Sequence, residues 1–242
     1  MTTIASNLQA VRAAMRAAAV LAGRTADDIS LLAVSKTFPA MALREAYQAG
    51  QVRFAESYVQ EALGKIAELH DLPVEWHFIG PLQSNKTRAI AEHFAWVHSV
   101  DRLKIAERLS AQRPRHMPPL QLCLQVNVSN EASKSGVSPD EACGLAQAIA
   151  MLPNLNLRGL MAVPAPSDVV VEQRAGFAQL RELYDQLNNR GLQLDTLSMG
   201  MSHDFAAAIA EGATIVRVGS AIFGNRVYQN NHLSTKDTKK QA

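Results

Sequence analysis

A lysine stands where a strongly apolar stretch of the sequence ends. Residues 29–34 read ISLLAV, and Ser35, Lys36 and Thr37 follow directly. A short apolar run of this kind is typical of a strand buried on both faces of a parallel sheet. Burial lowers the pKa of a lysine, and the neutral amine condenses with aldehydes. Lys36 could therefore bind a carbonyl compound covalently, although its position alone also allows a side chain that only extends to solvent.

Two loops near the end of the chain could bind phosphate. They read SMGMSHDF at residues 198–205 and VRVGSAIFG at residues 216–224. Glycine lets the backbone approach an anion closely, and the free N–H groups at the start of a helix attract negative charge. We expect Ser202 to cap the helix that follows it. Each loop alone could be an ordinary turn, but two such loops on neighbouring strands favour a phosphate site. Its candidate residues are Met199, Gly200, Ser202, Gly219 and Ser220.

Arg217 lies between these loops in the run IVRVG. Side chains alternate along a strand, so Arg217 points into the site if Val216 and Val218 point outward. A lysine opposite a phosphate site suggests a phosphorylated aldehyde held as a Schiff base. Pyridoxal phosphate is one such aldehyde, and its ring contains a pyridine nitrogen. A guanidinium beside that nitrogen would keep it unprotonated. Catalytic use of pyridoxal phosphate usually pairs the nitrogen with a carboxylate.

Short apolar runs alternate with helical patterns along most of the chain, which is typical of β/α units and a parallel sheet. The predicted strands are residues 29–34, 52–56, 75–80, 96–100, 120–128, 157–163, 196–200 and 214–219. The predicted helices between them are residues 40–49, 58–70, 84–93, 101–112, 139–151, 170–190 and 204–211. An amphipathic helix precedes them, with an apolar face formed by Ile4, Leu8, Val11, Met15 and Ala19.

Eight evenly spaced strands favour a single (β/α)8 barrel, the TIM barrel, with an extra N-terminal helix. An open doubly wound sheet usually has fewer strands and a G-x-G-x-x-G first turn, which this sequence lacks. We expect one α/β domain over residues 1–228 and a polar, disordered tail over residues 229–242. Ligands of such barrels bind at the C-terminal strand ends, so Lys36 and both loops should meet at one face.

The composition argues against several classes of protein. The 242 residues are 48% hydrophobic and 19% charged, with a net charge of +2, which is typical of a soluble globular chain with no footprint for nucleic acid. Arg12 and Arg16 interrupt the apolar N-terminus, so we expect neither a signal peptide nor a membrane span, and a cytoplasmic protein. Cys123 and Cys143 lack metal-ligand spacing, and we expect two buried thiols.

Three other side chains could carry chemistry. His77 and His98 lie in or near the third and fourth predicted strands, but no clustered carboxylates or cysteines accompany them, so we expect no metal and assign them packing or pocket-lining roles. Lys134, in the loop NEASKSG, is best explained as a surface lysine. A loop lysine on the ligand face could also receive or deliver an aldehyde.

Seven segments together resemble one protein family. They are AVSKTFP, YVQEALGKI, WHFIGPLQSNK, VNVSNEASKSGV, LRGLMAVPAP, LSMGMSHDF and VRVGSAIFG. In this order and spacing, from about Ile29 to Gly224, they look like the pyridoxal phosphate homeostasis proteins, which are single-domain relatives of the barrel half of alanine racemase. The resemblance implies that pyridoxal 5'-phosphate binds as an internal aldimine on Lys36. It further implies that Ser202, Gly219 and Ser220 hold the phosphate, that Arg217 faces the ring nitrogen, and that Met199 and Gly200 shape the phosphate loop.

The sequence departs from the family pattern at four positions. Ala55 replaces a glycine near the end of the second predicted strand. Ser57 replaces an asparagine expected near the cofactor, which could loosen contacts with the ring. His203 stands where aspartate is common, and Ser220 stands where threonine is common. Lys36 keeps the family pattern, and the two loop changes are mild, because Ser220 keeps a hydroxyl group and His203 can still lie at a helix N-terminus.

The expected function is that of a carrier and regulator of pyridoxal phosphate with little or no catalytic turnover. Racemase chemistry, as the resemblance implies, needs a second acid–base group from a second domain, and the chain ends shortly after the eighth predicted strand. Apo-enzymes that use the cofactor are possible acceptors, and we expect a monomer. Two alternatives stay open: a small amino-acid racemase with Tyr58 as the second base, and an aldolase in which Lys36 reacts with a phosphorylated sugar.

Overall fold

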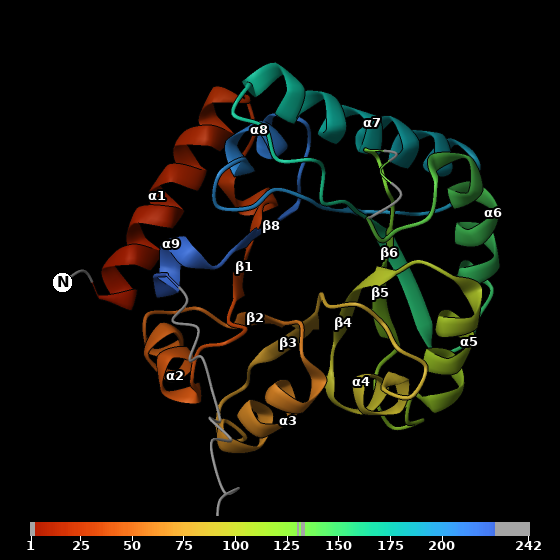
Figure 1. Ribbon diagram of the computed structural model, residues 1–242, viewed down its shortest axis with the longest axis horizontal. Coiled ribbons are helices and arrows are strands. Elements are labelled where there is room, and N and C mark those ends of the chain that lie inside the picture. Colours follow the sequence, from red (N-terminus) through yellow and green to blue (C-terminus); the bar gives the residue numbers. More distant parts are fainter. Residues whose placement is uncertain (1–2, 130, 132–133, 226–242) are drawn as a thin grey trace, which may run out of the picture.

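Eight parallel strands close into a barrel in which each strand pairs with the next and β8 pairs with β1 (Figure 1). This computed structural model describes residues 3–129, 131 and 134–225, and the tail expected at 229–242 lies outside them. The strands are β1 Ser30–Val34, β2 Arg53–Glu56, β3 Glu75–Phe78, β4 Trp96–Val100, β5 Leu120–Gln125, β6 Leu155–Met161, β7 Thr196–Ser198 and β8 Ile215–Val218. The predicted (β/α)8 barrel is confirmed.

Helices surround the barrel and connect successive strands (Figure 1). They are α1 Ile4–Leu21, the short 3-10 helix η1 Ala26–Asp28, α2 Ala40–Gln48, α3 Val59–Glu68, α4 Thr87–His93, α5 Leu103–Gln112, α6 Pro139–Ala150, α7 Val170–Asn189, α8 Phe205–Ala210 and α9 Ser220–Phe223. No helix in the described part of the chain is long and apolar enough to cross a bilayer.

The extra N-terminal helix α1 forms as predicted. Thr3 and Ser6 begin it with reciprocal side-chain-to-backbone hydrogen bonds, a capping box. Its buried side chains are Leu8, Val11, Met15 and Ala19, which is the predicted apolar face except for the partly buried Ile4. Helix α1 packs against α2, α8 and α9, next to the strands that begin and end the barrel.

Several predicted boundaries differ from the structure by one to three residues. Two of these boundaries, and one predicted cap residue, are wrong for a clear local reason. Strand β5 ends at Gln125 and not at residue 128. Val126 still donates from its amide to the Met161 carbonyl of β6 (2.8 Å), but beyond Gln125 the chain pairs with Val137 of the following loop in an isolated bridge. Helix α4 begins at Thr87 and not at residue 84, because the preceding residues form a turn in which Thr87 Oγ1 donates to the Ser84 carbonyl (3.0 Å). Helix α8 has Asp204 at its N-cap position, and not Ser202.

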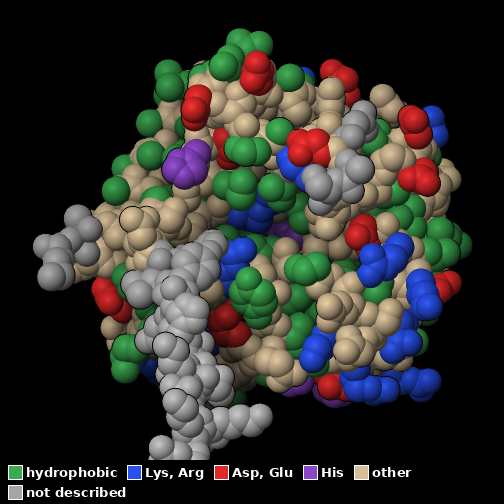
Figure 2. All heavy atoms as spheres, viewed as in Figure 1, with side chains coloured by type: hydrophobic (Ala, Val, Ile, Leu, Met, Phe, Trp, Pro, Cys, Tyr) green, Lys and Arg blue, Asp and Glu red, His purple; other side chains and the backbone are tan. Residues whose placement is uncertain are grey.

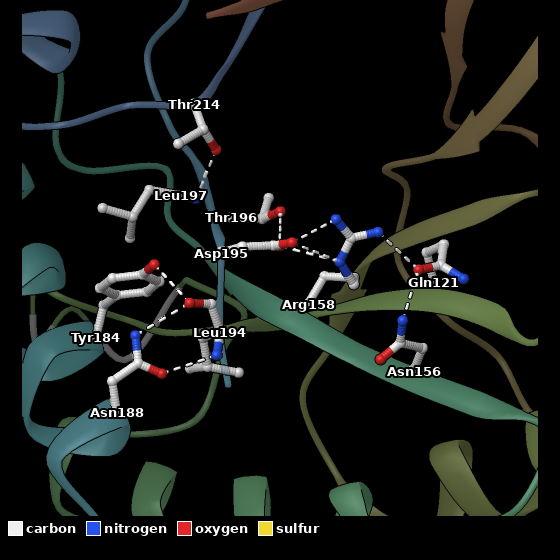
Figure 3. A network of polar contacts seen from close by, with 10 residues as sticks. All are labelled: Gln121, Asn156, Arg158, Tyr184, Asn188, Leu194, Asp195, Thr196, Leu197 and Thr214. Carbon is white, nitrogen blue, oxygen red and sulfur yellow. Dashed lines mark hydrogen bonds and ion pairs between the residues drawn. The ribbon is translucent and has the colours of Figure 1, made fainter. Parts of the chain in front are cut away.

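A polar network ties the amino-terminal ends of β5, β6 and β7 together (Figure 3). The Arg158 guanidinium lies between the Asp195 carboxylate (Nε–Oδ1 2.9 Å) and the Gln121 side-chain oxygen (Nη1–Oε1 2.9 Å). Tyr184 of α7 donates to the Leu194 carbonyl (2.6 Å) just before β7. Residues at this end of a TIM barrel generally contribute to stability and not to catalysis. The network therefore stabilises the barrel.

Two small apolar clusters occupy the barrel interior. One comprises Leu32, Val34, Ala55 and Ile215, and the other comprises Trp96, Cys123 and Met161. Alternate residues of the same strands pack outward in the large core beneath the helices. TIM barrels usually fill this space with bulky branched residues. Here polar side chains lie between the two clusters, as described below.

The two cysteines differ in environment. Cys123 is fully buried, and burial raises the pKa of its thiol to about 12, so it is unreactive. Cys143 of α6 is only half-buried, and Arg190 Nη1 contacts its sulfur (2.8 Å). The prediction of two buried thiols is therefore correct for Cys123 and wrong for Cys143, which lies at the edge of its helix's apolar face.

Candidate functional site

A cavity of about 190 Å³ opens where β1 and β8 end. It is lined by Val34, Lys36, Ile79, Met201, Ser202, His203, Arg217, Gly219 and Ser220. Viewed along the barrel, the surface is hollowed near the centre, and basic and histidine side chains are visible in the hollow (Figure 2). The cavity thus brings together five of the eight predicted cofactor-binding residues. They come from the ends of β1, β7 and β8, of which β1 lies far from the other two along the chain.

Strand alternation places Lys36 in this cavity. Val34 faces the barrel interior, Ser35 faces the helices, and Lys36 returns to the inner side beyond the end of β1. Lys36 is half-buried. Thr37, the next residue, has a φ of 73°, a left-handed conformation that β-branched residues rarely adopt. The turn that carries Lys36 must therefore be held by its surroundings.

A buried ion pair holds that turn. Lys65 of α3 donates from Nζ to the Ser35 carbonyl (2.8 Å) and to Glu56 Oε1 (2.8 Å), and the side chains of both Lys65 and Glu56 are almost fully buried. Ser35 Oγ also donates to Glu56 (2.6 Å). On the far side of Lys36, the Thr37 amide donates to Glu61 (2.5 Å), which pairs with Lys65 as well. Helix α3 thus fixes the backbone on both sides of Lys36.

Sequence reasoning missed Glu56, Glu61 and Lys65. Burial raises the pKa of the Glu56 carboxyl, although Lys65 and Ser35 act in the opposite direction. The signals were present in the sequence: a carboxylate ends the apolar run of β2, and a glutamate and a lysine stand four residues apart on α3. Such pairs usually lie on solvent-exposed helix faces, which is why the spacing alone did not indicate burial.

The two glycine–serine loops face each other across the cavity. Ser202 Oγ lies 3.5 Å from Ser220 Oγ. Gly200 has a φ of 91°, and a Cβ at this position would lie 2.6 Å from the Ala208 side chain. A Cβ on Gly219 would lie 3.1 Å from the Val34 carbonyl oxygen. The first loop therefore needs glycine at position 200, and the second loop packs tightly against the end of β1 at Gly219. Together the two loops present two hydroxyl groups to one point.

The capping prediction for Ser202 is wrong for a local reason. Asp204 Oδ1 accepts a hydrogen bond from the Met201 amide (2.5 Å), so the aspartate closes the turn before α8. Ser202 Oγ instead lies beside Ser220 in the cavity lining.

Arg217 points inward, as strand alternation predicts, while Val216 and Val218 pack in the outer core. Its guanidinium donates to the Ser198 carbonyl (2.6 Å), Ser198 Oγ (2.8 Å) and the Ala162 carbonyl (2.9 Å). Burial lowers the pKa of Arg217 to about 10. The side chain therefore remains a cation at neutral pH, with its orientation fixed by three oxygen atoms.

Other predicted residues lie outside the cavity lining. Met199 is buried in the outer core, and Gly200 has a left-handed backbone in the turn between β7 and α8. The backbone of Ser57 packs against Gly80, where a Cβ would lie 2.1 Å from the Ser57 carbonyl oxygen. Tyr58 is 56% exposed at the N-cap of α3. Lys134 pairs with Glu131 (3.2 Å) in its loop.

The sequence matches the family described as alanine racemase, N-terminal domain, over residues 4–227. It is 64% identical over 228 residues to the pyridoxal phosphate homeostasis protein of Pseudomonas aeruginosa, a match that covers 94% of this chain and 98% of that relative. The chain belongs to the pyridoxal phosphate homeostasis protein family. The family member from Escherichia coli K12 is 53% identical over 231 residues, covering 94% of this chain and 99% of the relative.

Solved structures agree with this membership. PipY of Synechococcus elongatus, in a structure described as having PLP bound, has a TM-score of 0.81 at 41% identity, and the match covers 92% of this chain and 100% of that chain. Alanine racemase of Corynebacterium glutamicum has a TM-score of 0.68 at 19% identity, and the match covers 95% of this chain but 63% of that one. The latter likeness shows a shared barrel fold. The family inferred from the seven sequence segments and the barrel inferred from the strand pattern are both confirmed.

Proposed function

We propose that this chain binds pyridoxal 5'-phosphate covalently through Lys36 and takes part in the homeostasis of that cofactor inside the cell. The observation that carries the proposal is the shared cavity, in which an amine, a buried guanidinium and two adjacent hydroxyls meet. Membership of a family whose members are named for pyridoxal phosphate homeostasis supports it. So does the relation to PipY, whose structure is described with PLP bound.

The donor set fits the cofactor group by group. When bound, the cofactor supplies an aldehyde, with which the Lys36 amine forms a C=N bond as one water leaves. We assign the phosphate to Ser202 and Ser220, with Gly219 letting the backbone approach closely. Arg217 is assigned to the ring nitrogen, as a fixed cation that donates and does not accept a proton.

Three assigned residues would act less directly. Gly200 and Met199 would set the path of the first phosphate loop, because Gly200 requires its left-handed backbone and Met199 is anchored in the outer core. Ser57 is assigned to the rim near the cofactor ring. Its backbone contact with Gly80 fixes its place beyond β2, and its short side chain would leave room beside the ring.

We further propose a carrier with little or no turnover. General acid–base chemistry on both faces of a cofactor needs a second group within hydrogen-bond reach. Tyr58, the candidate for a racemase, is mostly exposed and does not line the cavity. We propose a monomeric, cytoplasmic protein with one domain over residues 1–228, with cofactor-requiring apo-enzymes as acceptors and with neither nucleic acid nor membrane as a partner.

The decisive experiment loads the purified protein with pyridoxal phosphate, reduces it with borohydride and maps the modified peptide by mass spectrometry. We expect a yellow protein and one fixed adduct, on Lys36. The matched variants are Lys36→Ala and Lys134→Ala, of which only the first should lose that adduct and the wild-type spectrum. A wild-type protein that binds no pyridoxal phosphate would refute the proposal.

Two further measurements test the carrier role. Rapid exchange of the alanine α-proton in deuterated water would support the racemase alternative, because that exchange requires acid–base chemistry on the bound amino acid. Release of the cofactor to an apo-enzyme, compared with the same amount of free pyridoxal phosphate, tests delivery. We expect negligible exchange and measurable transfer.

A further inference from the structure

A continuous chain of hydrogen bonds runs through the barrel interior from Arg217 to the opposite end of the barrel. Arg217 Nη1 contacts Ser198 Oγ (2.8 Å), which contacts His98 Nδ1 (2.8 Å). His98 Nε2 contacts His77 Nδ1 (2.8 Å), and His77 Nε2 contacts Glu75 Oε1 (2.9 Å). Ser198 ends β7 and Glu75 begins β3, so the chain spans the barrel between its two apolar clusters.

The hydrogen atoms of this chain can be assigned in only one way while both histidines are neutral. A guanidinium only donates, and a carboxylate only accepts. His77 therefore donates from Nε2 to Glu75 and accepts at Nδ1. His98 must then donate from Nε2 and accept at Nδ1, which leaves the Ser198 hydroxyl donating to His98 and accepting from Arg217. All four hydrogen bonds point from the arginine toward the glutamate.

The surroundings keep both rings neutral. His77 and His98 are fully or almost fully buried, and burial lowers the pKa of each; for His98 the charge of Arg217 acts in the same direction. The Glu75 carboxyl has a lowered pKa because His77 and Arg53 hold its anion. The chain thus has a fixed cation at one end, a fixed anion at the other and oriented neutral groups between them.

The Arg217 guanidinium donates three hydrogen bonds to carbonyl and hydroxyl oxygens, each of which is uncharged. A buried cation in that state is stabilised by oriented dipoles, and polar groups in series polarise one another. Glu75 is the carboxylate at the far end of the series. The chain therefore does two things for Arg217: it fixes the guanidinium plane, and it aligns dipoles that stabilise its charge.

We propose that Glu75, His77, His98 and Ser198 are positioning residues that act on bound pyridoxal phosphate through Arg217, from the opposite end of the barrel. This inference rests on the proposed function, because Arg217 is there assigned to the ring nitrogen. The side chain of Glu75 bonds to Arg53 and His77, which both lie outside the cavity lining. A substitution at Glu75 nevertheless changes how the cofactor is bound, because it alters the orientation and the stabilisation of the Arg217 cation.

The first test needs no cofactor. Nitrogen-15 NMR of histidine-labelled protein at neutral pH should show His77 and His98 neutral, each with its hydrogen on Nε2. Glu75→Leu removes the acceptor and should shift the ring nitrogens of His98, two links away. Asp27→Asn, which removes an exposed charge near the amino-terminal end of β1 without touching the chain, should shift neither ring. A hydrogen on Nδ1 of either ring, or unchanged His98 signals in Glu75→Leu, would overturn the proposal.

The second test uses protein loaded with pyridoxal phosphate. Ser198→Ala and Glu75→Leu should shift the visible absorbance band and weaken cofactor binding about tenfold. This is about the smallest loss of affinity found when residues that hydrogen-bond to the ligands of a metal site are replaced. Ser198→Thr keeps the hydroxyl and should restore both properties. Glu75→Gln keeps an acceptor without the charge, so it should retain the orientation of the rings and show a smaller spectral shift. Circular dichroism establishes that each variant is folded.

The outcomes separate this inference from the function on which it rests. If the wild type binds no pyridoxal phosphate, the proposed function is refuted. The role of the hydrogen-bond chain in cofactor binding is then refuted as well. If the wild type binds the cofactor and the folded Ser198→Ala and Glu75→Leu variants match it in spectrum and affinity, the positioning role alone is refuted.

Discussion

The ammonium group of Lys65 lies beneath the turn that carries Lys36 and bonds to the Ser35 carbonyl and the Glu56 carboxylate. Removing one partner of a buried ion pair leaves the other charge without compensation. We expect Lys65→Met to lower the free energy of unfolding by about 3–5 kcal/mol and to weaken the covalent binding of pyridoxal phosphate. Chemical denaturation and borohydride trapping measure the two effects.

Two controls separate this ion pair from general lysine effects. Lys104→Met removes an exposed lysine of α5 and should change stability by less than about 0.5 kcal/mol. The double variant Glu56→Gln with Lys65→Met removes both charges and should be more stable than Lys65→Met alone. A single Lys65→Met variant as stable as the Lys104→Met control would show that the ion pair does not hold the turn.

At the scale of elements, the connection from β7 to α8 depends on Gly200. Its φ of 91° is unfavourable for any other residue, and a Cβ there would lie 2.6 Å from Ala208. We expect Gly200→Ala to lower the free energy of unfolding by at least about 1–2 kcal/mol, the cost of a left-handed alanine, and to weaken phosphate binding in the cavity. Thermal unfolding and titration with inorganic phosphate are the measurements.

Gly144 supplies the matched control for Gly200. It lies inside helix α6 without a positive φ, and a Cβ added there would have open space around it, with no described atom within 4 Å. Gly144→Ala should therefore raise the free energy of unfolding by about 0.5–1 kcal/mol, the usual preference of a helix interior for alanine. If both alanine variants were destabilised equally, the strain assigned to Gly200 would be wrong.

The element scale also shows where prediction from sequence stops. All eight strands could be predicted, because a strand covered by helices must be almost continuously apolar, as in residues 31–34. The N-cap position of α8 could not, because serine and aspartate are both favoured there. The hydrogen bond from the Met201 amide to Asp204, which closes the turn before the helix, is not visible in the sequence. Lys36 could be placed at the ligand face from the strand order alone.

Contacts that cross the barrel are harder to predict from sequence. His98 and Ser198 are 100 residues apart, and their contact depends on strand register and on which side chains point inward. Neither is visible in local periodicity. His77 and His98 were expected to pack or to line the pocket, and both are buried, but their hydrogen bond to each other inside the barrel could not be foreseen for the same reason.

At the scale of the whole molecule, the two buried histidines make stability depend on pH. Their folded pKa values lie below the ordinary value of 6.5. As the pH falls through 6.5 the unfolded chain takes up protons that the folded protein does not, so the free energy of unfolding falls. Each histidine contributes up to about 1.4 kcal/mol per pH unit until its folded pKa is reached.

The carboxyl of Glu56 acts in the opposite direction. Its raised pKa means that the folded protein takes up this proton first, so it adds stability as the pH falls through the folded pKa toward the unfolded one. Comparison of variants isolates the histidine contribution. In His98→Gln, the slope of the free energy of unfolding against pH should decrease by the amount that corresponds to about one proton, between pH 6.5 and the folded pKa of His98. His116→Gln, at an exposed site, should leave the wild-type slope unchanged. Denaturation at stepped pH values gives both slopes.

The chain from Arg217 to Glu75 also has a consequence for the order of folding. Its members come from β3, β4, β7 and β8, so it cannot be completed until β7 and β8 have packed across the barrel from β3 and β4. Before that moment these polar groups remain hydrated, and closing the barrel strips their water in one step. Contacts of such long sequence separation form slowly. We therefore expect closure at β8 to be the late, rate-limiting event of refolding. Replacement of Arg217 should then change the refolding rate more than any substitution in the helices α4 and α5.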